Sequence, residues 1–99
     1  MKNISKVVLI AILAASATAA LAQGADTYKA KCQMCHGADG AASGPAGKAM
    51  GTPPVSAFAK ASEADLIAIT KNGKGKMPAY GGKLTDPQIK EAVDYLRSL

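Results

Sequence analysis

The chain has 99 residues, 12 of them Lys or Arg and seven Asp or Glu, which gives a net charge of +5. This length holds at most one domain. The charge is modest and no stretch interleaves basic with aromatic residues, which argues against nucleic-acid binding.

The first 22 residues are predicted to be a secretory signal peptide. Lys2 and Lys6 form a positive start, an unbroken apolar run of nine residues follows, and residues 20–22 give a small-x-small cleavage site. An uncleaved membrane anchor is the alternative. However, the uncharged run 7–22 has 16 residues, fewer than the ~20 that a spanning helix needs. We therefore expect cleavage after Ala22 and export to a periplasm or an equivalent lumen, with no stable membrane insertion afterwards.

The remaining domain, residues 23–99, keeps ten basic and seven acidic residues, a net charge of +3. It is poor in large apolar side chains, with one Phe, three Tyr and no Trp, and it contains all ten glycines. A domain of this size usually needs a disulfide, a metal or another staple. We expect a bound cofactor to supply part of its core.

Residues 25–35 are predicted to form a helix. Asp26 or Thr27 can cap its start, and a glycine follows its end. Tyr28 precedes Cys32 by four residues and shares its face. Tyr28 should therefore pack inward as a structural residue.

Two thiols and a histidine lie together in the sequence Cys32-Gln33-Met34-Cys35-His36. This spacing matches the attachment pattern of a c-type haem. On a helix it is close to one turn, so both sulfurs can form thioethers with the haem while His36 binds the iron. Structural zinc would need four ligands, and the chain has no other Cys or His. A thioredoxin-like motif would need a βαβ context, and a disulfide here would stabilise little. We expect one covalent haem c per chain.

Residues 37–54 contain five Gly and three Pro and are predicted to be a long irregular loop. A histidine that binds a metal normally donates its other ring N–H to a carbonyl or carboxylate. The carbonyl of Pro45 is a candidate acceptor for His36. Alternatively, Pro45 only stiffens a turn between Gly44 and Gly47.

A short helical turn over residues 56–61 should direct Phe58 inward. Ser62 then begins a helix, with Asp65 as its capping partner, and residues 72–73 end it. The last helix should run from Asp86 or Pro87 to Ser98. Its signals are a Thr-x-x-Gln capping box and one apolar stripe formed by Ile89, Ala92, Val93 and Leu96.

The loop 72–82 contains four Gly and places Met77 directly before Pro78. Glycines let a backbone approach a flat ligand closely, and a thioether sulfur suits haem iron. We expect Met77 to be the second axial ligand. Met34 and Met50 compete for this role, but thioether links on both sides should direct Met34 away from the iron, and Met50 lies in the other loop.

With these residues in hand, residues 25–99 resemble a class I cytochrome c, in particular the small cytochromes c of bacteria and photosynthetic lumens. The resemblance is most specific at residues 32–36 and 72–82. It implies an all-α fold of three to five short helices and long loops around one haem, with the first and last helices crossing. On that pattern Tyr28 matches the aromatic residue of the first helix, and Tyr95 matches its partner on the last. Pro45 matches the family's proline near the histidine ligand, although the loop lengths here differ.

The expected function is that of a soluble periplasmic or lumenal electron carrier rather than an enzyme. The alternatives are a haem-bearing subunit of a larger oxidase or dehydrogenase complex and a haem sensor with a labile axial site. We expect a monomer whose redox protein partners are acidic at the docking surface. A positive rim facing them can be formed by Lys48, Lys71, Lys74, Lys76 and Lys83.

Mass spectrometry of the exported protein tests the processing. We expect a chain that starts at Gln23 and carries the mass of one haem, because the small residues 20–22 favour cleavage there. A mass that retains residues 1–22 would show an anchor instead.

Overall fold

The computed structural model describes residues 19–99, so most of the expected signal segment lies outside the described residues. Residues 19–31 are helical. They are followed by α2 (Gln33–His36), α3 (Pro45–Met50), the 3-10 helix η1 (Val55–Phe58), α4 (Glu63–Asn72) and α5 (Asp86–Arg97). Residues 19–99 form no strand, only an isolated bridge between Lys74 and Met77. The all-α expectation is confirmed. Within the same residues, no helix is long and apolar enough to cross a membrane.

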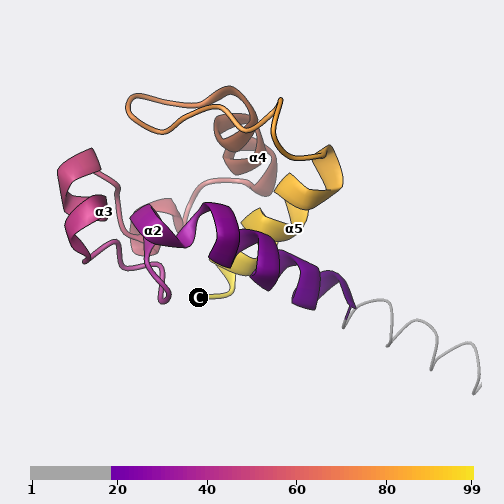
Figure 1. Ribbon diagram of the computed structural model, residues 1–99, viewed down its shortest axis with the longest axis horizontal. Coiled ribbons are helices and arrows are strands. Elements are labelled where there is room, and N and C mark those ends of the chain that lie inside the picture. Colours follow the sequence, from indigo (N-terminus) through magenta and orange to yellow (C-terminus); the bar gives the residue numbers. More distant parts are fainter. Residues whose placement is uncertain (1–18) are drawn as a thin grey trace, which may run out of the picture.

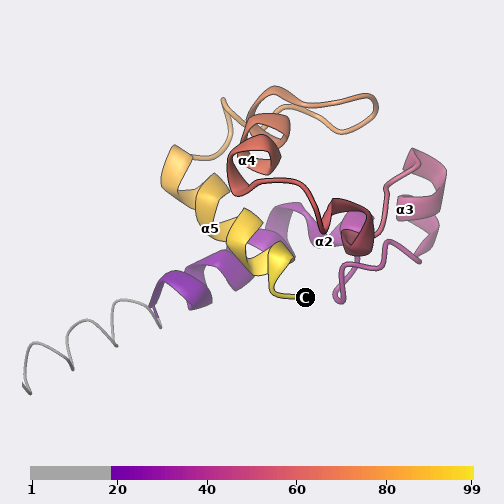
Figure 2. The same cartoon turned by 180° about the vertical axis from the view of Figure 1, so that it is seen from behind.

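The helical segment 19–31 crosses α5, as both views of the ribbon show (Figures 1 and 2). Gly24 is buried at the crossing, where a Cβ atom would overlap the main-chain carbonyl of Glu91. One turn further on, Tyr28 is 1% exposed. Its ring packs on Tyr95 with the centroids 5.2 Å apart and the planes tilted by 53°. The expected pairing of these two tyrosines is therefore confirmed.

The expected single helix over residues 25–35 is interrupted at Cys32. Cys32 adopts φ −116° and ψ −35°, and the amide of Cys35 donates to the carbonyl of Cys32 at 3.3 Å. That bond replaces the i→i−4 bond to Lys31 that an uninterrupted α-helix would make. The carbonyl of Lys31, directly before Cys32, therefore does not accept the hydrogen bond from Cys35 that a continuous helix would give it.

Helices α4 and α5 carry the side-chain core, which is centred on Leu66, Ile89 and Val93. Both begin as expected: Ser62 Oγ accepts from the Asp65 amide at 3.1 Å, and Thr85 forms a reciprocal capping box with Gln88. Such caps are each worth about 1 kcal/mol. The partly buried side chains packed against this core are Phe58, Ala61, Ile67, Tyr80 and Leu84.

The expectation of an irregular stretch over residues 37–54 is wrong in its middle, because α3 occupies residues 45–50. Pro45 is the first residue of α3, and Gly51 follows its last residue. Proline in the first turn and glycine after the end are helix boundary signals as well as loop signals. The helix between them is too short to display an apolar periodicity, so the composition alone indicated a loop.

Gly24→Ala should lower the free energy of unfolding by about 1–3 kcal/mol, because a methyl group forced into a packed contact costs that much. The loss should appear despite the ~1 kcal/mol by which Ala favours a helix over Gly. Denaturant unfolding of the haem-loaded protein measures it.

Gly82→Ala is the control. Gly82 caps no helix, its φ lies outside the left-handed region, and no atom lies within 4 Å of the position that a Cβ atom would take. An equal loss for both variants would contradict the close approach of the two helices at Gly24.

Candidate functional site

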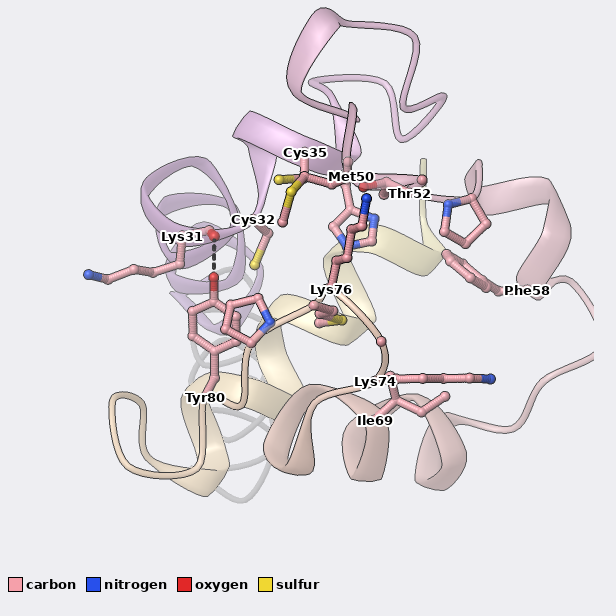
Figure 3. A pocket seen from close by; sticks show the side chains of 16 residues that line it. Lys31, Cys32, Cys35, Met50, Thr52, Phe58, Ile69, Lys74, Lys76 and Tyr80 are labelled. Atoms are coloured by element: carbon pink, nitrogen blue, oxygen red, sulfur yellow. Dashed lines mark hydrogen bonds between the residues drawn. The ribbon is translucent and has the colours of Figure 1, made fainter. Parts of the chain in front are cut away.

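A cavity of about 520 Å³ opens between α2, α3, α4 and the loop that joins α4 to α5 (Figure 3). This volume is in the range of small-molecule and cofactor sites, about 300–1,000 Å³. The cavity brings together the sequence-predicted residues Cys32, Cys35, His36 and Met77. The apolar part of its wall includes Pro53, Phe58, Ile69 and Pro78.

The two cysteines are unpaired and half-buried at this wall. Burial, followed by the neighbouring Cys35, raises the pKa of the Cys32 thiol to about 11. Redox-active and metal-binding cysteines depend instead on a thiolate, which a low pKa favours. Among residues 19–99, no group of three or more His, Cys, Asp or Glu side chains is arranged to hold a metal ion. The pair therefore fits a covalent attachment site better than a dithiol switch or a zinc site.

His36 is the last residue of α2 and is fixed from both sides. Its carbonyl accepts from the Ala42 amide at 2.9 Å, and the next carbonyl, of Gly37, accepts from the Tyr28 hydroxyl at 2.5 Å. The Phe58 ring meets the imidazole edge-on at 6.4 Å between centroids. Burial lowers the pKa of His36, which favours the neutral imidazole that binds metals.

Met77 is held in a tight turn of the α4–α5 loop. Its amide donates to the Lys74 carbonyl at 2.9 Å, and its carbonyl accepts from the Lys74 amide at 3.1 Å. Gly73 precedes this turn at φ +80°, where a Cβ atom would lie 2.9 Å from the Met77 carbonyl oxygen. Only glycine fits there without strain. The loop extends toward α3 (Figures 1 and 2), and the Lys76 ammonium donates to the Ala49 carbonyl at 3.4 Å.

Comparison with known proteins finds a matching family model and several related sequences. The family model of the cytochrome c oxidase cbb3-type subunit III matches residues 19–96. Cytochrome c6 of Thermosynechococcus vestitus is 33% identical over 88 residues, which cover 89% of this chain and 78% of the relative. Cytochrome c-555 of Chlorobaculum thiosulfatiphilum is 40% identical over 78 residues, 76% of this chain and 91% of the relative. No solved structure matches.

The chain belongs to the class I, single-haem cytochromes c. A third relative, cytochrome c-551 of Halorhodospira halochloris, is 48% identical over 33 residues, a third of this chain and 42% of the relative. Membership implies one covalently bound haem c per chain.

The residues that line the cavity of this cytochrome suit a covalently bound haem. Nδ1 of His36 is buried and has no hydrogen-bond partner among the described residues. A buried polar atom without a partner costs about 1–3 kcal/mol in a folded protein. An imidazole whose Nδ1 makes no hydrogen bond to the described residues is available to a metal ion, and the two free thiols and the largely apolar wall beside it suit a covalently attached haem. The hydrogen bond expected from His36 to Pro45 is not formed in this structure, where Pro45 instead starts α3.

The three candidate methionines of the cytochrome occupy different positions. Met34 is 80% exposed, in agreement with the expectation that it faces away from the iron. Met50 ends α3, is 40% exposed and borders the mouth of the cavity. Met77 also lines a second, smaller cavity together with His36. Of these three methionines, Met77 is thus the one that lines both cavities with His36.

Tyr80 and Lys31 belong to the cavity wall, although the sequence did not single them out. The Tyr80 hydroxyl donates to the Lys31 carbonyl at 3.1 Å. A lone aromatic residue in a glycine-rich loop, three positions after Met77, was the signal that could have identified Tyr80. Nothing in the sequence marks the carbonyl of Lys31, because its availability depends on the helix break at Cys32.

Residues 23–99 without haem should be largely unfolded at room temperature. Their side-chain core is small, and an unfilled apolar cavity leaves the ordering of about 77 residues without a matching burial of surface. Far-ultraviolet circular dichroism of a purified haem-free variant, Cys32→Ser with Cys35→Ser, compared with the haem-loaded wild type, measures this. A cooperative thermal transition from a fully helical haem-free chain would contradict it.

Proposed function

We propose that this cytochrome is a one-electron carrier in which Cys32 and Cys35 hold the haem covalently, and His36 and Met77 are the axial ligands of its iron. The observation that carries the proposal is the convergence of His36 and Met77 on the same two cavities from separate elements. An imidazole and a thioether together fill both axial positions. No coordination position then remains for a substrate.

The bound haem supplies the one-electron chemistry, and the chain supplies a fixed and dry environment. His36 is immobilised through the hydrogen bonds of its own and the following carbonyl, and Met77 through its paired bonds with Lys74. The ring of Phe58 and the side chain of Ile69 give the wall an apolar surface that would keep water away from the haem. Hydrogen bonds to the main chain that hold both ligand residues in place would keep the structural change during electron transfer small.

Several lysines support an acidic redox protein as the partner. Lys31, Lys74 and Lys76 line the cavity and would steer an acidic surface toward it. Three residues of the expected rim have partners among the described residues. Lys71 pairs with the Asp86 carboxylate at 3.2 Å, which offsets its charge, whereas the Lys83 ammonium lies 5.5 Å from the centre of the uncharged Tyr80 ring and the Lys76 ammonium donates to the uncharged Ala49 carbonyl. We propose a rim centred on Lys74 and Lys76, on a chain that acts as a monomer.

Export to a periplasm or lumen is proposed from the signal-like residues 1–22. Cleavage after Ala22 would cut the helical segment 19–31 near its described start. It would leave Gly24 and Tyr28, two residues that lie against α5, on the mature chain. The proposed cleavage is therefore compatible with the helix crossing.

A subunit of a larger oxidase is the second candidate, because the description of the matching family model names an oxidase subunit. Gel filtration with candidate membrane oxidases distinguishes the two roles. A carrier elutes alone at the volume of a monomer, whereas a subunit co-elutes with its complex.

Met77→Ala should open a coordination position and lower the reduction potential. A thioether favours ferrous iron, and the axial ligands of haem set potentials over a range of roughly 0.8 V. The variant should bind carbon monoxide, which the wild type should refuse. A redox titration and optical spectra with and without carbon monoxide measure both effects.

Met50→Ala is the matched control and should leave the potential nearly unchanged. Lys74→Gln should also leave it unchanged while it weakens the salt dependence of electron transfer to an acidic partner. A large shift in Met50→Ala and none in Met77→Ala would reassign the ligand. No shift in either would remove the main support for the carrier.

A further inference from the structure

The Tyr80 side chain joins two parts of the chain that are 49 residues apart. Its hydroxyl donates to the main-chain carbonyl of Lys31 at 3.1 Å, the bond drawn as a dashed line in Figure 3. Tyr80 also lines the same cavity as Cys32 and Met77. The bond therefore ties the loop that carries Met77 to the end of the helix that leads into Cys32.

The carbonyl of Lys31 is free to accept this bond because of the helix break. The amide of Cys35, which would be its partner in a continuous helix, donates to the Cys32 carbonyl instead. The last carbonyls of a helix need partners from elsewhere. A tyrosine hydroxyl from the opposite wall supplies one here.

The main chain fixes Tyr80 independently of its hydroxyl. The Tyr80 amide donates to the Thr70 carbonyl and the Gly81 amide to the Lys71 carbonyl, each at 3.0 Å. These acceptors belong to the last turn of α4, and the Lys83 ammonium lies over the Tyr80 ring. The hydroxyl thus extends from a rigid base.

Met77 closes the turn with Lys74 through its paired main-chain bonds and precedes the Tyr80 base by three residues. Withdrawal of Met77 from the cavity would require this turn to move relative to Tyr80 or to pull Tyr80 away from Lys31. The Tyr80 hydroxyl is the side-chain bond that joins residues 74–80 to the helix of the attachment cysteines. The other side-chain hydrogen bond of residues 74–80 within the described part of the chain, from Lys76 to the Ala49 carbonyl, is longer at 3.4 Å and reaches α3 instead.

We propose that Tyr80 is a positioning residue for the sixth ligand. Its hydroxyl bond to the Lys31 carbonyl holds residues 74–80 over the cavity, so that an external ligand competes poorly with Met77. This inference rests on the proposed role of Met77 as an iron ligand.

Optical titration of the ferric, haem-loaded protein with imidazole tests the inference. Imidazole must displace the sixth ligand, so its apparent affinity reports the ease with which the loop gives way. Tyr80→Phe keeps the ring and removes one neutral hydrogen bond, and it should tighten imidazole binding roughly three- to ten-fold. Tyr95→Phe is the matched control, because the Tyr95 hydroxyl makes no hydrogen bond within residues 19–99, and it should bind imidazole like the wild type.

A double-mutant cycle separates positioning from a general loosening of the fold. Met77→Ala should bind imidazole more tightly than Tyr80→Phe does, and adding Tyr80→Phe to it should change nothing further. An unchanged affinity in Tyr80→Phe, with tight binding in Met77→Ala, would overturn the positioning role and leave the axial assignment intact. An effect of Tyr80→Phe that persists in the Met77→Ala background, or an equal effect of Tyr95→Phe, would also overturn it. If Met77→Ala binds imidazole like the wild type, the proposed axial ligand itself is wrong.

Discussion

The close approach of the helical segment 19–31 to α5 is the contact on which the other parts depend. A glycine at position 24 lets the two backbones meet, and Tyr28 and Tyr95 fill the space one turn further on. That contact fixes the direction in which the chain reaches Cys32. Because Tyr28 also donates to the Gly37 carbonyl, the same helix holds both ends of the segment that contains the cysteines and His36. The cavity is thus positioned by a crossing that lies outside it.

Tyrosine hydroxyls and loop amides satisfy many of the backbone groups that short helices leave without partners. The carbonyls of Lys31 and Gly37 accept from Tyr80 and Tyr28, and those of Thr70 and Lys71 accept from the following loop. Short helices have a high proportion of such unpaired groups. In a domain with so small an apolar core, these bonds define the walls of the cavity while leaving its interior largely apolar.

The sequence predicted best where a local signal determines the structure. The capping residues Ser62 and Thr85 and the apolar stripe of α5 identified two helices with nearly correct bounds, because each signal acts within a few residues. The attachment motif and Met77 were predicted as one site because of their residue types and the resemblance to a family. Their convergence on one cavity depends on tertiary packing, which the motif alone does not specify.

The features that the sequence did not predict lack an unambiguous local signal. Helix α3 was missed because Pro45 and Gly51 fit either a loop or the two ends of a short helix. The break at Cys32 was missed because residues 25–35 carry no proline or glycine to announce it. The contact between Tyr80 and Lys31 follows from that break, so it could not be predicted from either residue alone.

Main-chain hydrogen bonds hold both ends of the turn that carries Met77. Lys74 and Met77 bond to each other within the turn, and the Tyr80 amide donates to Thr70 in the last turn of α4. We therefore expect residues 74–79 to open as a unit while Leu66, Ile89 and Val93 stay packed, with Tyr80 in place against them. In a protein with such a unit, the amides of one loop exchange with solvent through an opening much smaller than global unfolding. We expect two stabilities of this cytochrome, one for its helical framework and a lower one for the segment that carries Met77.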